Sequence, residues 1–222
     1  MTILLVVPAV GALLVSLLPK GSDLRAKQLA FAVSLLTLVL TAVACVQFDN
    51  AGPRFQFEQH HEWIKALGVT YSVGADGIAL VLIALAALLV PLVLLASWDT
   101  VEELLDVEGP DARLTPQKSV KSFFALILIL ESFMVGVFAA TDVFLFYVFF
   151  EAMLIPMYFL IGSYGGPRRS YAAVKFLLYS LAGGLLMLAA VIGLYVASTR
   201  QGPGTFSFDK LTQLEFSHST QI

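Results

Sequence analysis

The stretch VFLFYVFFEAMLIPMYFLIG, residues 143–162, decides the fold because it is almost entirely apolar and aromatic. A helix needs roughly 20 apolar residues to cross the hydrocarbon core of a bilayer. The run is continuous and does not alternate apolar with polar positions, so it predicts a transmembrane helix and not a barrel strand. It nevertheless contains a carboxylate, Glu151, and an ionisable group at that place requires an explanation.

The composition extends this interpretation to all 222 residues. Hydrophobic residues make up 59% of the chain and charged residues 13%, whereas soluble domains carry about 25% charged residues. These values indicate an all-α, polytopic membrane protein. The net charge of -3 gives no indication of nucleic-acid binding. The single cysteine, Cys45, excludes a disulfide framework and a cysteine-based metal or cluster site.

Hydrophobicity predicts six transmembrane helices, at residues 2–18, 29–48, 77–97, 122–140, 143–164 and 171–197. The fourth and fifth are separated only by Thr141 and Asp142, which predicts a tight helical hairpin. We expect residues 1–121 to hold three helices, with an external loop at 49–76 and an acidic cytoplasmic loop at 98–121. Residues 122–197 would hold the next three helices, and residues 198–222 another external loop.

Basic residues predict the orientation of these helices. The connections after the first, third and fifth spans hold eight Lys and Arg residues, and the opposite side holds four. Because cytoplasmic loops are enriched in Lys and Arg, the odd-numbered connections are predicted to be cytoplasmic and the N-terminus to lie outside. The adjacent His60 and His61 of the first external loop do not share a helix face, and no carboxylate or cysteine pattern completes a metal site there.

Three ionisable residues, Glu131, Glu151 and Lys175, lie inside predicted spans. A charge at the bilayer centre costs about 2.5–3.5 kcal/mol on insertion scales, and such residues usually mark a pathway through a bundle. At 1.5 Å per residue, Glu131 lies about 14 Å from the cytoplasmic end and Glu151 about 12 Å from the outer end, so both approach the midplane. Lys175 lies only about 6 Å from the cytoplasmic end of its helix and can also snorkel to the interface. The alternative for all three is a structural pairing that specifies helix packing.

Helical periodicity adds two polar-edged stripes, which we expect to face each other across a hydrated path. The stripes are Tyr147, Glu151 and Tyr158 on one helix, and Tyr171, Lys175 and Tyr179 on the next. A desolvated carboxyl group holds its proton firmly, and a nearby lysine favours its release. Movement of Lys175 would therefore load or release a proton at Glu151. Pro156 can kink the helix beside this acid or introduce only a harmless bend. The small residues Gly183 and Gly184 are interpreted as sites of close helix packing.

The segment TDVFLFYVFFEAMLIPMYFLIGSYGG, followed by RRSYAAVKFLLYSLAGGLLML, resembles the chain M family of antiporter-like subunits of bacterial NADH–quinone oxidoreductase, respiratory complex I. The resemblance covers roughly residues 62–200, and more loosely the whole chain. It implies a proton-translocating subunit of the membrane arm in the bacterial inner (plasma) membrane. Glu151 matches the family's glutamate on the fifth helix and Lys175 a lysine on the sixth, and Glu131 matches a position that is acidic in some members.

The resemblance also implies what lies beyond these residues. The family has a roughly fourteen-helix fold with two inverted repeats, so the chain would be the N-terminal portion of a longer protein. No redox cofactor is expected on the chain, and FMN, iron–sulfur clusters and quinone are expected on other subunits. Expected partners are other membrane-arm subunits, especially the neighbouring antiporter-like ones, and the lipid bilayer. Two alternatives remain: a subunit of a multisubunit cation/proton antiporter, and a structural or assembly membrane subunit.

Overall fold

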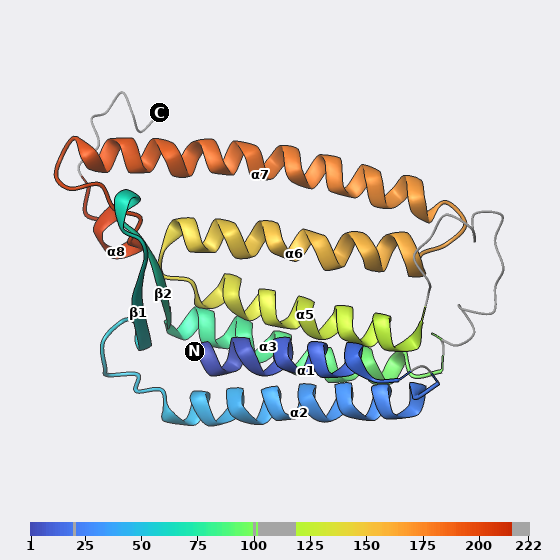
Figure 1. Ribbon diagram of the computed structural model, residues 1–222. Helices are drawn as coiled ribbons and strands as arrows, with labels where there is room; N and C mark the ends of the chain where they lie inside the picture. The colour runs from blue at the N-terminus through green and yellow to red at the C-terminus, as the bar shows by residue number, and fades with distance from the viewer. Residues whose placement is uncertain (20, 100, 102–118, 215–222) are drawn as a thin grey trace.

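A computed structural model of the chain describes residues 1–19, 21–99, 101 and 119–214. Within these residues six long helices lie side by side (Figure 1). They are α1 (Thr2–Leu17), α2 (Asp23–Gln47), α3 (Gly77–Ala96), α5 (Val120–Ala139), α6 (Val143–Tyr164) and α7 (Arg169–Thr199). All except the shorter α1 are long and apolar enough to cross a membrane. The expected polytopic helix bundle is confirmed, and most of the acidic loop expected at 98–121 lies outside the described residues.

Helix α2 differs most from its expected bounds, because it begins six residues before the predicted span 29–48. Its first two turns contain Asp23, Arg25 and Lys27, which end the apolar run without disfavouring a helix. An acidic residue in the first turn also complements the helix dipole. Hydrophobicity therefore predicted the apolar part of α2 and did not include its polar first residues, 23–28.

The connections alternate between the two ends of the bundle (Figure 1). The N-terminus, the α5–α6 turn, a two-stranded sheet and the short helix α8 (Phe208–Leu211) lie at one end. The α1–α2 and α6–α7 turns lie at the other. This arrangement agrees with the predicted separation of odd and even connections, while the side of the membrane that each end faces stays a prediction.

The expected external loop contains a β-hairpin that the sequence analysis did not predict. Strand β1 (Gln56–Ile64) runs antiparallel to β2 (Val69–Ala75), with the 3-10 turn η1 (Lys65–Leu67) between them. Gly68 follows this turn at a φ of 66°, a left-handed conformation that favours glycine. Most of β1 is exposed, whereas most of β2 is buried. Short strands leave only a weak pattern inside a polar loop, and tertiary packing decides whether they form.

The α5–α6 turn is held between β2 and the segment that leads into α8. The backbone N–H of Thr141 donates to the carbonyl of Ser72 at 3.0 Å, and that of Phe208 donates to the carbonyl of Thr141 at 3.0 Å. The buried Asp142 caps α6 by accepting from the N–H groups of Phe144 and Leu145. Its second carboxylate oxygen accepts from the backbone and hydroxyl of Thr70, at 3.2 and 3.1 Å. The predicted tight helical hairpin is confirmed.

Helices α5 and α7 occupy different environments. Helix α5 packs against α1, α2, α3 and α6, and buried residues recur along its whole length. Helix α7 packs against α6, and few of its residues are buried. Helix α6 therefore lies between a well-packed bundle on one side and a single helix on the other (Figure 1). This layering determines the surroundings of each predicted site residue.

Candidate functional site

Glu131 is fully buried on α5, the helix that packs against α1, α2, α3 and α6. Its exposed fraction is 0%, and neither carboxylate oxygen has a hydrogen-bond partner among the described residues. The next residue, Ser132, donates its hydroxyl to the carbonyl of Leu5 on α1, at 2.7 Å. Burying an unpaired charge is costly, so a carboxyl group in such a place favours its neutral, protonated form. The arrangement can therefore hold a proton.

Glu151 lies at the α6–α7 interface and is half-buried. Its Oε1 is buried and has no hydrogen-bond partner among the described residues. The carboxylate rests against the backbone of Gly184, because a Cβ atom built at that position would overlap Glu151 Oε1. The adjacent Gly183 is exposed, and a Cβ atom there would meet nothing within 4 Å. The absence of a side chain at Gly184 thus provides the space in which the Glu151 carboxylate lies.

Lys175 lies on an exposed face of α7, between two aromatic rings. Its Nζ is 5.8 Å from the ring centroids of both Tyr171 and Tyr179, within the range of a cation–π interaction. The predicted stripe on α7 therefore exists. However, Lys175 and Gly184 are nine residues apart on one helix, which is two and a half turns and places them on opposite faces, about 13 Å apart along the axis. The described structure does not bring Lys175 beside Glu151, and the two stripes do not face each other.

The two glutamates lie at the same level of the bundle. Glu131 precedes the end of α5 by eight residues, and Glu151 follows the start of α6 by eight residues. Each is therefore about 12 Å from the α5–α6 turn, as the sequence analysis expected. They nevertheless differ in their surroundings, because Glu131 is fully buried on α5 and Glu151 is half-buried against α7. Pro156 is buried within α6, and the helix continues through it without a break.

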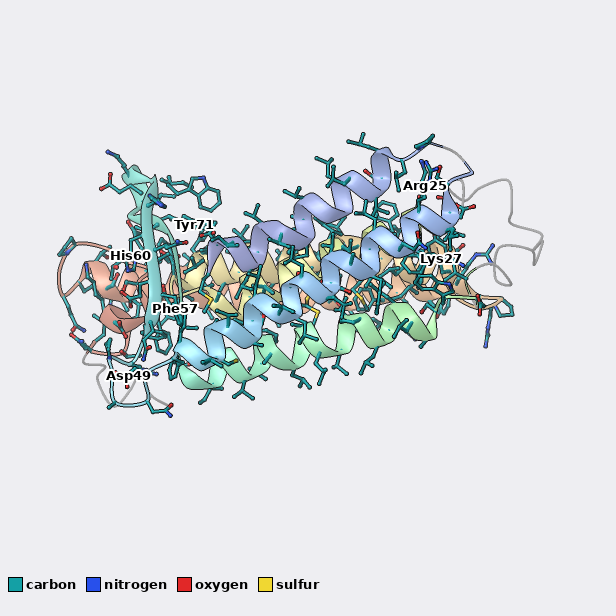
Figure 2. The ribbon with its side chains drawn as sticks, turned by 90° about the horizontal axis from the view of Figure 1, so that it is seen from below. Arg25, Lys27, Asp49, Phe57, His60 and Tyr71 are labelled. Atoms are coloured by element: carbon teal, nitrogen blue, oxygen red, sulfur yellow. The ribbon has the colours of Figure 1, made fainter. Side chains whose placement is uncertain are left out.

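Lys27, one of the eight basic residues predicted to lie in the connections after the first, third and fifth spans, is instead buried on α2. Lys27 is 3% exposed, and its Nζ lies 5.7 Å from the ring centroid of Trp98. Figure 2 shows it near the end of α2 that lies away from the hairpin. Further along α2, Ser34, Thr37 and Thr41 are fully buried and donate their hydroxyls to carbonyls of their own helix. The spacing of seven residues from Lys27 to Ser34 and on to Thr41 was the available signal, because residues so spaced share a helix face.

Comparison with known proteins agrees with this fold. Residues 140–221 match the family model described as NADH:quinone oxidoreductase/Mrp antiporter, TM. NADH-quinone oxidoreductase subunit M of Mycobacterium tuberculosis is 45% identical, over 95% of this chain and 41% of the relative. The same subunit of Rhodobacter capsulatus is 33% identical, over 99% of this chain and 39% of the relative. The chain thus spans about two fifths of the length of these curated relatives.

Solved structures show the same architecture. A chain of respiratory complex I from Thermus thermophilus with bound NADH superimposes with a TM-score of 0.75 at 28% identity, over 96% of this chain and 39% of that one. A chain of the Mrp complex from Dietzia gives a TM-score of 0.63 at 22% identity, over 92% of this chain and 20% of that one, which is a similarity of fold. Over nearly its whole length the chain is therefore similar to subunit M of NADH-quinone oxidoreductases.

Proposed function

We propose that this chain is part of a proton-translocating membrane-arm subunit of NADH–quinone oxidoreductase. The observation that carries the proposal is the Glu151 carboxylate, which lies deep in the membrane-spanning bundle, half-buried against Gly184 of the neighbouring helix. Ionisable groups at such a depth are costly and are retained mainly where they carry ions or protons. The relationship to subunit M supports the same function.

In the proposed mechanism Glu151 alternates between a protonated and an ionised form. Its buried Oε1 favours the protonated form, and its half-exposed position allows water to take the proton away. Glu131 is a second proton-holding group at the same level, fully buried on α5. We also assign Lys175 to this proton path. It lies two and a half turns before Gly184 on α7, so its positive charge acts on the path from a distance and not by direct contact with Glu151.

The remaining chemistry of the complex is assigned to other subunits. NADH oxidation and quinone reduction need FMN, iron–sulfur clusters and a quinone site, which we place outside this chain. The proposed partners are other membrane-arm subunits, chiefly the neighbouring antiporter-like ones. The proposed location is the bacterial inner membrane, with the N-terminus and the hairpin end of the bundle outside.

The test is Glu151→Gln in the complete, membrane-embedded complex. Glutamine keeps the size of the side chain but cannot exchange a proton, so we expect proton pumping to fall by about tenfold or more, within the range for loss of a positioned acid–base group. The matched control is Glu62→Gln, which neutralises an exposed glutamate paired with Lys65 on the hairpin and should leave pumping unchanged. NADH oxidation with undiminished pumping in the Glu151 variant would contradict the proposal. A purely structural role predicts instead that neutral replacements of Glu131, Glu151 and Lys175 are tolerated together.

A further inference from the structure

A chain of hydrogen-bonded side chains leads from the solvent to the α5–α6 turn. Glu58 Oε2 lies 3.2 Å from His60 Nε2, and both side chains are partly exposed on β1. His60 Nδ1 lies 2.5 Å from Ser72 Oγ on β2, and Ser72 Oγ lies 2.6 Å from Thr141 Oγ1 in the turn. Figure 2 shows His60 on the hairpin, at the end of the bundle away from Lys27. The chain therefore connects an exposed imidazole with the turn that joins the helices of the two glutamates.

Each of these hydrogen-bonded side chains can pass a proton in either direction. A hydroxyl group both donates and accepts hydrogen bonds, and an imidazole can release a proton from one nitrogen while it receives one at the other. In one arrangement Thr141 donates to Ser72, Ser72 donates to His60 Nδ1, and His60 Nε2–H donates to Glu58. In the opposite arrangement each hydrogen lies on the other side of its bond. A rigid structural tie needs only one of these arrangements, whereas a proton relay needs both.

Thr141, the inner end of this series of hydrogen-bonded side chains, borders a cavity of about 430 Å³. Thr141 lines it together with Arg54, Asp76 and Asp142, while most of the other lining residues are apolar and some, such as Ile78, are exposed at the surface. A buried water needs a space of about 15 Å³ or more and two to four polar partners, so this cavity has room for several waters beside Thr141. The glutamates lie about 12 Å further along α5 and α6.

We propose that Glu58, His60, Ser72 and Thr141 form a proton relay between the α5–α6 turn and the solvent at the hairpin end of the bundle. This inference rests on the proposed proton translocation. For each proton released, Thr141 Oγ1 takes one from water in the cavity and passes its own hydrogen to Ser72. Ser72 passes its hydrogen to His60 Nδ1, and the Nε2 proton moves to Glu58 and then to the solvent. Rotation of the two hydroxyls and exchange of the imidazole hydrogens restore the starting arrangement, so one proton enters and one leaves.

Neighbouring side chains do not take part in the proposed proton relay. Ionisable groups near the relay have other partners. His61 stacks on the Tyr71 ring, and the Tyr71 hydroxyl lies 3.0 Å from that of Thr2. Asp142 binds Thr70 and caps α6, Asp76 caps α3, and Arg54 lies over the rings of Phe55 and Phe208. The hairpin also does not depend on the relay for its attachment. The backbone bond from Thr141 to Ser72 and the Asp142 contacts with Thr70 would remain without the His60 side chain.

The experiment compares His60→Ala with His61→Ala in the complete complex in sealed membrane vesicles. The two histidines are neighbours on one strand, and only His60 belongs to the relay. We expect His60→Ala to lower the rate of proton pumping by about tenfold or more, and His61→Ala to leave it unchanged. Added imidazole should restore pumping in the His60 variant, because the position is exposed, and a lost structural tie would not be restored in this way. Equal pumping in the two variants, or a loss that imidazole does not relieve, would overturn the relay.

A second variant, Ser72→Ala, breaks the relay while His60 is present. We expect the same loss of pumping, without rescue by imidazole, because Ser72 is buried on β2. Normal pumping in Ser72→Ala would overturn the relay even if the His60 variant failed to assemble. Glu151→Gln separates this inference from the function on which it rests. If Glu151→Gln abolishes pumping while the His60 and Ser72 variants pump normally, only the relay is wrong; if the Glu151 variant also pumps normally, the proposed function is wrong.

Discussion

Replacement of Gly184 by alanine would place a methyl group where the Glu151 carboxylate now lies. A Cβ atom at position 184 overlaps Glu151 Oε1, and ordinary contact begins only at 3.4 Å. The carboxylate must therefore retreat by about 2 Å to reach a normal van der Waals distance. Gly183→Ala is a matched control, because the same methyl group one position earlier meets nothing within 4 Å.

The cost to stability of Gly184→Ala should be small. Alanine favours a helix interior over glycine by about 1 kcal/mol. The overlapped atoms are the far end of a flexible side chain, and moving such a side chain off its preferred rotamer costs about 0.5–1.5 kcal/mol. The two terms nearly cancel for Gly184→Ala, whereas Gly183→Ala retains the gain. The effect of Gly184→Ala should therefore appear in function, through the displaced carboxylate, and not in folding.

The assay measures NADH oxidation and proton pumping in sealed vesicles that contain the complete complex, together with its thermal stability. We expect Gly184→Ala to lower pumping by about tenfold or more, because a misplacement of 1 Å can cost a reacting group about 100-fold. Gly183→Ala should pump normally. If both variants pump normally, the position of the Glu151 carboxylate against Gly184 has no part in proton transfer, and the reasoning is refuted.

Two further substitutions test the packing that holds the site. Gly136→Ala would push a methyl group into the Phe149 ring, where a Cβ atom would come within 2.7 Å; we expect a loss of about 1–3 kcal/mol in the free energy of unfolding, seen as a lower melting temperature than for Gly193→Ala, which meets nothing within 4 Å. Asp142→Ala removes the α6 cap and the acceptor for Thr70, so we expect a loss of about 1–2 kcal/mol and faster proteolysis of the hairpin. Unchanged proteolysis would show that Asp142 does not hold the hairpin on the turn.

Much of the fold could be predicted because a bilayer imposes simple rules on a sequence. Apolar runs of about 20 residues must become helices, since every backbone polar group has to be satisfied inside the segment. The separation of two runs by Thr141 and Asp142 left no room for anything except a tight turn. Counting residues from that turn placed Glu131 and Glu151 at one level, because the rise per residue of a helix is constant. Depth along a helix is thus a property of the sequence alone.

The direction in which a side chain points was harder to predict, because it depends on which helices become neighbours. Gly183 and Gly184 are equivalent by composition, and only the position of α6 distinguishes the one that makes room for Glu151. Lys175 was expected to face Glu151, but α7 packs against α6 with a different face and leaves Lys175 exposed. The fine placement of the site therefore belongs to the packing of α6 and α7.

The sequence by itself determined that this is a membrane-embedded helix bundle with acids at mid-depth, because hydrophobic length and helical rise are local properties. Only the tertiary structure decided how distant segments meet. It joined His60, Ser72 and Thr141, which come from β1, β2 and the α5–α6 turn, into one chain of hydrogen bonds. It also placed the Glu151 carboxylate against Gly184, which is 33 residues further along the sequence. Hydrogen bonds and close packing between such residues depend on distances of a few ångströms, which the order of residues along the chain does not contain.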